Sequence, residues 1–347
     1  MVSWWPIPIA LAFLISAWLT PVVRVLALRF GVIDSPDGGR KLHREPTPLL
    51  GGLAIVASFS IVTIGVLLSS SELTSGAIGI HHFIGFFVGI AILTIGGVID
   101  DRFTISAKYS MALFVLASLV AVFGGINVAK MTNPLGGVIV LAPIAASVVA
   151  FVWILAMTMT TKLLDGVDGL ASSVSLVGSL MIAALALTPT YFQSDVALLA
   201  LIFSGSILGF ILWNWHPAQI FLGESGSTVL GFTVGVLSVI AGSKMATALL
   251  VLGIPAIDVG IVAVRRYRAG KNPFTTADRR HFHFMLRDAG LSPRRVTLLY
   301  SCIALAFGVT SLLFASWQKV IALGILGILA VIGISLLAKY LDDSKAS

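Results

Sequence analysis

The sequence is divided into long stretches that contain no charged residue. Ten uncharged runs have at least 19 residues each, at positions 1–23, 46–71, 73–99, 109–129, 131–161, 169–194, 196–223, 225–243, 296–318 and 320–338. Because about 20 residues of helix cross the hydrocarbon core of a bilayer, each run predicts one membrane span. An eleventh span is expected at 245–264, where Asp258 alone interrupts the apolar pattern.

The composition excludes an ordinary soluble protein. Of the 347 residues, 58% are hydrophobic and only 11% are charged, whereas soluble domains have about 25% charged residues. We therefore expect an all-α, polytopic integral membrane protein with about eleven transmembrane helices in a single domain, 1–347. Residues 1–20 have no Lys or Arg ahead of their apolar stretch, so no signal peptide is expected. Cys302 is the only cysteine, which excludes an internal disulfide, and alternating residues at 127–140 predict an outer hairpin.

The basic residues predict the orientation in the membrane. If the first helix runs inward, 19 of the 22 Lys and Arg residues fall on one side, and only Lys130, Lys244 and Lys319 fall on the other. The positive-inside rule then places the N-terminus outside and the C-terminus in the cytoplasm. All acidic residues except Glu72 and Asp195 lie at the same cytoplasmic ends. The rule does not require this of carboxylates, so we expect a functional site on the cytoplasmic face.

The third span ends in Asp100-Asp101-Arg102. Two adjacent carboxylates at a helix C-terminus oppose the helix dipole and repel each other. A divalent cation would relieve both effects, and an Asp pair commonly provides oxygen ligands for Mg²⁺. The alternative is a solvated helix end.

A second acidic motif follows the fifth span. Residues 163–170 read Leu-Leu-Asp-Gly-Val-Asp-Gly-Leu, so that Asp165 and Asp168 are each followed by glycine. This pattern suits a sharp turn in which carboxylates and backbone amides face one ligand, although a capped turn between two helices is the alternative. Lys162 precedes the turn, and neutralising the acids and contacting a phosphate both remain open as its role.

Two further carboxylates are candidates for the site. Glu224 lies in the otherwise uncharged loop 214–227, where helix capping is the alternative to a functional role. Asp258 lies inside an apolar span, and an ionisable residue at that depth is a functional candidate by default. Pairing with Arg265 or Arg266 is its structural alternative.

The two long cytoplasmic loops, 30–48 and 265–295, carry cations and imidazoles that suit phosphate. The candidates are Lys41, His43, Arg279, Arg280, His281 and His283. Contacts with anionic lipid headgroups are the alternative, and nucleic acid is not expected because no soluble fold presents a basic face. Carboxylates, cations and imidazoles at one membrane boundary favour Mg²⁺-assisted phosphoryl transfer between a water-soluble and a lipid-soluble substrate.

The order of these motifs resembles the bacterial polyprenyl-phosphate N-acetylhexosamine-1-phosphate transferases, glycosyltransferase family 4. The matching motifs are Asp34-Ser-Pro through His43, Pro46-Thr-Pro through Gly52, Asp100-Asp101, Asp165-Gly-Val-Asp168-Gly, Asn214 through Ser227, and Asp278 through His283. The resemblance implies that undecaprenyl phosphate attacks the β-phosphate of a UDP-N-acetylhexosamine and that UMP is released. It also implies Mg²⁺, with Mn²⁺ as an alternative, and a multi-pass protein of the bacterial inner membrane whose active site faces the cytoplasm.

The first-loop pattern Arg-Lys-x-His and the helix count are closer to the N-acetylglucosamine-1-phosphate branch of the family, which carries out the first membrane step of cell-envelope polysaccharide synthesis. The phospho-N-acetylmuramoyl-pentapeptide transferases are the alternative branch. Membrane lipids are expected neighbours, and a homodimer remains open.

The resemblance also implies roles for individual residues. Catalytic roles are implied for Asp100, Asp101, Asp165, Asp168, His281 and His283. Substrate-binding roles are implied for Lys41, His43, Lys162, Asn214, Arg279 and Arg280. The implied Mg²⁺ ligands are Asp100, Asp101 and Glu224.

Three residues depart from the family pattern. Glu224 stands where members usually have Asp, Lys162 stands where they usually have Asn, and Phe284 stands where a third His is usual. These departures keep a catalytically inactive membrane scaffold open as an alternative. A secondary transporter is the rival from another class, but transporters usually place charges near the bilayer midplane on broken helices.

Overall fold

A computed structural model of the chain describes residues 4–35, 46–76, 78–133, 136–240, 245–270, 281–314 and 316–346. Each uncharged run contains a helix or a bent helix pair. The helices are α1 (Pro6–Arg29), α2 (Gly52–Ser69), α3 (Ile80–Phe103), α4 (Ala107–Phe123), α5 (Pro143–Leu164), α6 (Leu170–Ala186), α7 (Ser194–Asn214), α8 (Glu224–Ile240), α9 (Met245–Val251), α10 (Gly253–Arg268), α12 (Pro293–Leu313) and α13 (Ser316–Ala346). The short α11 (Phe282–Asp288) lies between runs, and the 3₁₀ turn η1 (Glu72–Thr74) begins at the charged residue that separates the second run from the third.

The helix lengths confirm a polytopic membrane protein. Among the described residues, seven helices are long and apolar enough to cross a membrane, and α9 with α10 passes the same test as a bent pair. The remaining three, α4, α6 and α8, have 17 residues each, which corresponds to about 26 Å at the usual helical rise.

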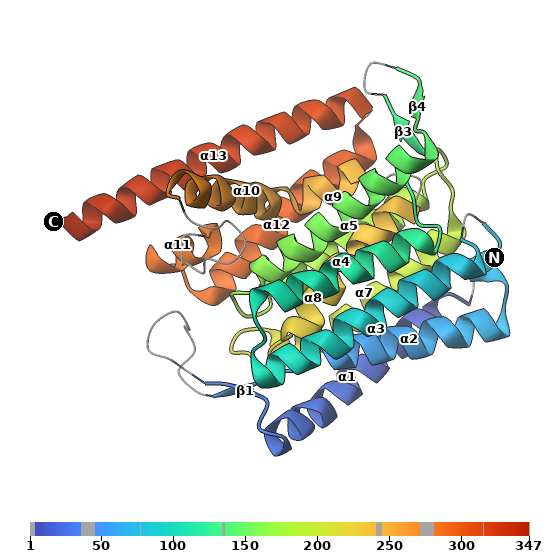
Figure 1. Ribbon diagram of the computed structural model, residues 1–347, viewed down its shortest axis with the longest axis horizontal. Coiled ribbons are helices and arrows are strands. Elements are labelled where there is room, and N and C mark those ends of the chain that lie inside the picture. The colour runs from blue at the N-terminus through green and yellow to red at the C-terminus, as the bar shows by residue number, and fades with distance from the viewer. Residues whose placement is uncertain are drawn as a thin grey trace.

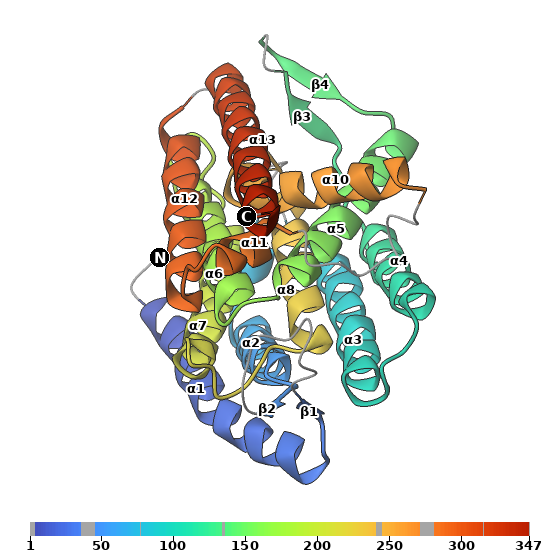
Figure 2. The ribbon, with the colours of Figure 1, turned by 90° about the vertical axis from the view of Figure 1, so that its left-hand side faces the viewer.

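We expected one continuous span at 245–264. The structure instead has two helices there, α9 and α10, bent by 77° relative to each other. The break follows from Pro255, which lies early in α10. Proline has no N–H to donate to the carbonyl four residues earlier, and its ring clashes with that carbonyl. That carbonyl belongs to Val251, the last residue of α9. As a result, α10 runs across the direction of the neighbouring helices (Figure 2).

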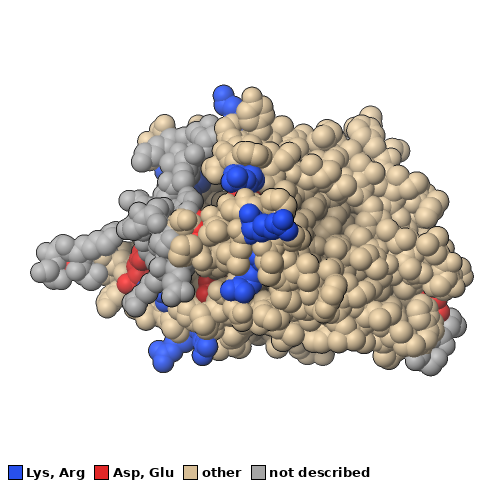
Figure 3. All heavy atoms as spheres, turned by 90° about the horizontal axis from the view of Figure 1, so that it is seen from below, with Lys and Arg blue, Asp and Glu red and all other residues tan. Residues whose placement is uncertain are grey.

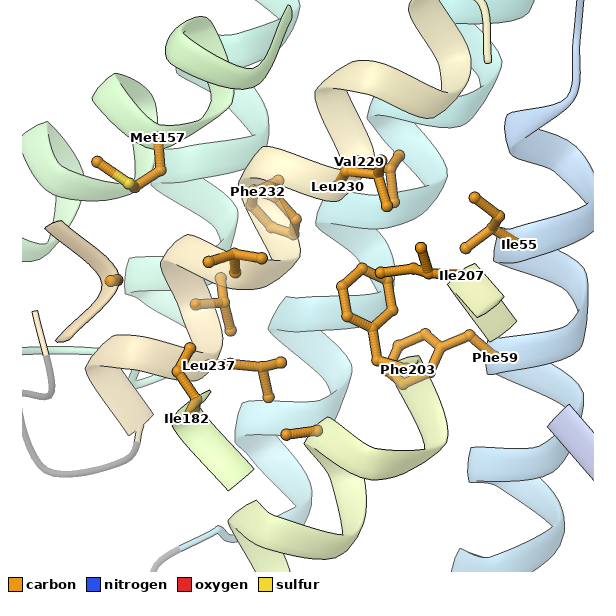
Figure 4. Packing of buried hydrophobic residues seen from close by; sticks show 14 of the residues in the cluster. Ile55, Phe59, Met157, Ile182, Phe203, Ile207, Val229, Leu230, Phe232 and Leu237 are labelled. Atoms are coloured by element: carbon orange, nitrogen blue, oxygen red, sulfur yellow. The ribbon is translucent and has the colours of Figure 1, made fainter. Parts of the chain in front are cut away.

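The centre of the bundle is α8, where every residue from Ser225 to Val239 is buried. Helices α2, α3, α5 and α6 all contact it, and Figure 2 shows it between them. Phe59 of α2 and Phe203 of α7 meet edge to face with ring centroids 5.2 Å apart, and Phe232 of α8 lies nearby (Figure 4). The outer helices instead expose large apolar side chains, such as Trp18 at 68% and Leu336 at 64%, which suits contact with lipid.

The two ends of the bundle differ in charge. At one end of the bundle, helices α1, α3, α5 and α7 finish and helices α2, α4, α6 and α8 begin. We call this the polar end. The short helix α11 and the C-terminus also lie there (Figure 1). Lys and Arg side chains gather toward this end (Figure 3). A two-residue ladder of β1 (Ile33–Asp34) with β2 (Thr47–Pro48) also lies at the polar end. At the opposite end, β3 (Lys130–Thr132) pairs antiparallel with β4 (Val138–Val140), which confirms the expected hairpin.

Small residues bring three helices into backbone contact at the polar end. A Cβ atom added to Gly52 of α2 would collide with the backbone of Gly226 of α8, and one added to Gly97 of α3 would collide with the backbone of Ser225. The Gly52 amide also donates to the carbonyl of Leu222 at 2.9 Å. Small residues permit such close approach of helices in membranes, and here they place the first turn of α8 against α2 and α3.

Candidate active site

Asp101, near the end of α3, caps the first turn of α8. Its Oδ1 accepts from the backbone amide of Glu224 at 2.7 Å, and its Oδ2 accepts from the amide and hydroxyl of Ser225 at 3.3 and 3.0 Å. The preceding residue, Gly223, has a φ of +72°, and a Cβ atom there would collide with this carboxylate. A negative charge at a helix N-terminus is favourable, so two helices distant in the sequence are joined through one side chain.

Asp100 points to a different partner. Its Oδ1 accepts from the amide of Ile105 at 2.7 Å, which closes the turn after α3. Successive helical side chains lie about 100° apart around the axis, so the two neighbouring carboxylates do not face one point as a pair. Asp100 nevertheless lines a narrow recess between α3, α4 and α8 together with Glu224.

Asp165 lies in the turn between α5 and α6, where the carboxylates gather. Burial raises the pKa of Asp165 to about 8, and repulsion from Asp101, Glu224 and Asp168 adds to the shift. Among the described residues, none donates a hydrogen bond to its carboxylate. The structure therefore brings the acids of three distant motifs into one region, which we call the acid cluster: Asp100, Asp101, Asp165, Asp168 and Glu224.

Lys162, in the last turn of α5, forms an ion pair with Oε1 of Glu224. Its ammonium also lies 4.9 Å from the centroid of the Phe114 ring of α4, a geometry that favours a cation. Lys162 therefore neutralises one acid, which is one of the two roles that the sequence left open for it. Glu224, an expected metal ligand, has this ammonium as its partner.

Asp168 joins the α5–α6 turn to the loop before α8. Its Oδ2 lies 2.6 Å from Nδ1 of His216 and accepts from the amide of Ala218 at 3.1 Å. The carbonyl of His216 accepts from Nε of Arg294 at 2.8 Å. His216 was not among the residues predicted from the sequence. The signal that could have identified it is the presence of an imidazole in the loop 214–227.

Asn214 is 3% exposed and holds the same loop from within. Its side-chain oxygen accepts from the hydroxyl of Ser172 at 2.7 Å, and its amide donates to the carbonyl of Ile220 at 3.0 Å. Both contacts are internal, so in this arrangement Asn214 orders the loop. The substrate-binding role that the resemblance implied for Asn214 stays a prediction.

Asp258 of α10 pairs with His281, whose Nδ1 lies 2.8 Å from Oδ2, and its Oδ1 accepts from the amide of Phe282 at 2.9 Å. The structural alternative was an arginine on the same helix, Arg265 or Arg266. The partners instead come from the start of α11, so Asp258 attaches that helix to the bundle and orients the His281 ring.

His283 lies behind the acidic turn. It is 1% exposed, its ring stacks on that of His281 with centroids 5.7 Å apart, and Gly166 packs against it so closely that a Cβ atom would collide with the imidazole. Burial, and then the neighbouring His281, lowers the pKa of His283 to about 3. His283 is therefore a neutral ring that supports the turn carrying Asp165.

The remaining candidates, Lys41, His43, Arg279 and Arg280, lie outside the described residues. Within the described ranges, no three His, Cys, Asp or Glu side chains converge as a ready-made metal site. The acid cluster nevertheless fits a divalent cation in its chemistry, because its partly buried carboxylates outnumber the one ammonium that contacts them in the described part of the chain. Mg²⁺ usually keeps several waters and needs only one or two carboxylates from the protein.

Comparison with known proteins gives the family. Residues 83–242 match the sequence model described as Glycosyl transferase family 4. A probable undecaprenyl-phosphate N-acetylglucosaminyl 1-phosphate transferase of Bacillus subtilis is 30% identical over 335 residues, covering 94% of this chain and 90% of the relative. The chain belongs to glycosyl transferase family 4.

Two other relatives are similarly named. A decaprenyl-phosphate N-acetylglucosaminephosphotransferase of Mycolicibacterium smegmatis is 32% identical, over 92% of this chain and 85% of its own length. An undecaprenyl-phosphate alpha-N-acetylglucosaminyl 1-phosphate transferase of Escherichia coli is 28% identical, over 84% of this chain and 79% of its own length. The family that the motif order indicated is confirmed, and the segment 83–242 contains the whole acid cluster.

Proposed function

We propose that this protein transfers N-acetylglucosamine 1-phosphate from UDP-N-acetylglucosamine to undecaprenyl phosphate and releases UMP. The names of the relatives support the sugar and the polyprenyl phosphate acceptor. The single observation in the structure that carries the proposal is that Asp101, Asp165 and Glu224 lie close enough at the polar end to repel one another. Partly buried acids in excess of cations are costly to fold, so they are expected where charge serves chemistry.

The reaction forms one bond and breaks another. An oxygen of the lipid phosphate bonds to the β-phosphorus of the UDP-sugar while the bond from that phosphorus to the bridging oxygen breaks, and this oxygen leaves with UMP. Bound Mg²⁺ would neutralise the diphosphate oxygens during the displacement. Asp165, which has no donor among the described residues, and Asp101, which α8 holds in place, would hold the ion.

The surrounding residues position these two acids. Ser225 and the start of α8 fix Asp101, and His283 supports the turn that carries Asp165. His216 fixes Asp168, which we assign to the nucleotide side of the site. Such positioning is the main contribution that a protein makes to phosphoryl transfer.

We also propose that the acid cluster faces the cytoplasm. The positive-inside rule would orient the polar end inward, since the order of the spans in the sequence assigns 19 of the 22 basic residues to that side. A water-soluble nucleotide sugar would then reach the acids from the cytoplasm, and the lipid phosphate would reach them from the inner leaflet. Insertion of a cysteine reporter into the β3–β4 hairpin tests this, because it should react with a membrane-impermeant thiol reagent in intact cells.

The experiment that tests the function is UMP release by the purified full-length chain. The chain is supplied with Mg²⁺, undecaprenyl phosphate and, separately, UDP-N-acetylglucosamine, UDP-N-acetylgalactosamine and UDP-N-acetylmuramoyl-pentapeptide. We expect release from the first and its loss on adding a chelator. Release from the pentapeptide substrate alone would indicate the other branch of the family. No release from any sugar by folded protein would indicate a scaffold, and metal-independent uptake into proteoliposomes would indicate a transporter.

A further inference from the structure

The ammonium of Lys162 is the cation within the acid cluster. In the described part of the chain, no other Lys or Arg contacts Asp100, Asp101, Asp165, Asp168 or Glu224. Lys162 reaches Glu224 from 62 positions earlier in the sequence. Its side chain crosses between α5, α4 and α8, where the Phe114 ring lies beneath the ammonium. The carboxylate of Glu224 and the ring of Phe114 therefore both stabilise the ammonium of Lys162.

The pair also joins two of the three positions at which this sequence departs from its family pattern. The resemblance implies an amide at position 162 and an Asp at position 224, where this sequence has a longer cation and a longer acid. The structure shows that these two replacements contact each other. They act as one matched change, an added positive charge together with a carboxylate long enough to bind it.

The ammonium keeps donors to spare. A lysine has three N–H groups, of which the contact with Glu224 uses one. The Lys162 side chain is 29% exposed whereas that of Glu224 is 14% exposed, so the cation lies on the open side of the pair. Lysine binds phosphate as a point charge, and an ammonium beside Glu224 repels a divalent cation from the same carboxylate.

We propose that Lys162 binds the diphosphate of the nucleotide sugar and that Glu224 is a positioning residue for Lys162 rather than a primary ligand of the divalent cation. The inference rests on the proposed function and refines it. The metal then depends on Asp101 and Asp165, and the phosphate charge is shared between the metal and a fixed ammonium. Losing either member of the pair should weaken binding of the UDP-sugar in the same way.

The test compares Lys162→Gln, Glu224→Gln, the double variant and the control Lys108→Gln, an exposed lysine near the same end. Two quantities are measured: the KM for the UDP-sugar, and Mn²⁺ affinity without substrate by electron paramagnetic resonance. We expect each single variant to raise KM by about ten- to a hundredfold, the range for a charged hydrogen bond, with a smaller change in kcat. Because the pair acts as a unit, the double variant should be no worse than Lys162→Gln.

The Mn²⁺ titration separates the inference from the proposed function. Glu224→Gln should retain Mn²⁺ affinity within about threefold, whereas loss of a direct ligand should cost at least the roughly ten- to a hundredfold that is typical even of residues that only support a ligand. Strong loss of Mn²⁺ binding in Glu224→Gln, or an unchanged KM in folded Lys162→Gln, overturns the inference. If wild-type protein releases no UMP, the proposed function fails, yet the titration still decides whether Glu224 is a ligand. Should Lys162→Gln fail to fold, Lys162→Asn replaces it, with folding checked by thermal melting.

Discussion

Acidic residues lie at both ends of the bundle, but their surroundings differ. At the opposite end, Asp195 is 1% exposed, and its Oδ2 accepts from the amide of Ile78 at 3.0 Å; Glu72 accepts from the indole of Trp5 at 3.3 Å. Each of these acids accepts from one donor, and the Oδ1 of Asp195 is buried without a partner among the described residues. At the polar end, Asp165 is surrounded by other carboxylates, and one ammonium in the described ranges contacts the cluster.

The difference separates structural carboxylates from functional ones. A single buried acid bound by a backbone amide holds a loop in place at modest net gain. Several acids in one partly buried region repel one another, and removing them from water is costly unless each is paired. We propose that bound substrate and a divalent cation complete the arrangement at the polar end, whereas the acids at the opposite end hold loops in place.

The strongest test of the comparison is the same chemical change at each end. We expect Asp101→Asn to lower UMP release by at least about a hundredfold, since it removes a charge placed at the reacting phosphates. Asp195→Asn should leave UMP release within about twofold, because its amide oxygen still accepts from Ile78 and it lies far from the chemistry. Equal losses in the two variants would break the distinction.

The next effect concerns packing at the polar end. Gly52→Ala places a Cβ atom against the backbone of Gly226, whereas Gly65→Ala, on the same helix, meets nothing within 4 Å. We expect Gly52→Ala to destabilise the protein by about 1–3 kcal/mol, the usual cost of overpacking. Gly65→Ala should be neutral or stabilising by up to about 1 kcal/mol. Thermal melting in detergent compares them, and similar melting temperatures would show that α2 and α8 are not locked together there.

An effect of similar size is expected from truncation at the opposite end. Asp195→Ala leaves the amide of Ile78 without its acceptor, which costs about 1–3 kcal/mol for a buried group. Because the loop rather than the site is affected, the melting temperature should fall while the kcat of the folded protein stays unchanged. A fall in kcat without a fall in melting temperature would mean that this end takes part in function.

A further effect, measured without activity, is a pH dependence of stability in the metal-free protein. Burial and neighbouring acids raise the pKa of Asp165 from 3.8 to about 8. The folded state therefore holds a proton that the unfolded state releases, so stability is full below the ordinary pKa and is lost as pH rises through about 8. In chelator, the melting temperature should fall from pH 6 to pH 8 and then level off. Asp165→Asn should flatten this slope; an unchanged slope would assign it to other groups.

The helices were largely predictable because membrane spans are a property of one continuous segment. The length of an uncharged run decides whether it can cross a bilayer, and every run indeed contains a helix. The bend at α9 and α10 was missed, since Pro255 was counted as part of an apolar stretch although it removes a helical donor. The chemistry of one residue determined that break, and composition did not reveal it.

The site was predictable in its members but not in its contacts. The acids of the cluster were recognised from their motifs, whereas the partners that hold them come from elsewhere in the fold. Asp101 caps a helix that begins 123 residues later, and Asp258 pairs with His281 rather than with a neighbour on its own helix. Opposite charges at Lys162 and Glu224 allowed pairing, but only the packing of α5 against α8 selected it.

The most direct test of the account is the number of divalent cations bound at the polar end. Equilibrium dialysis of the purified full-length chain against Mn²⁺ should show a single saturable site per chain that Mg²⁺ displaces. The double variant Asp101→Asn/Asp165→Asn should lose this site, and Asp195→Asn should retain it. A double variant that binds Mn²⁺ as tightly as the wild type would contradict the claim that these carboxylates form the metal-dependent centre.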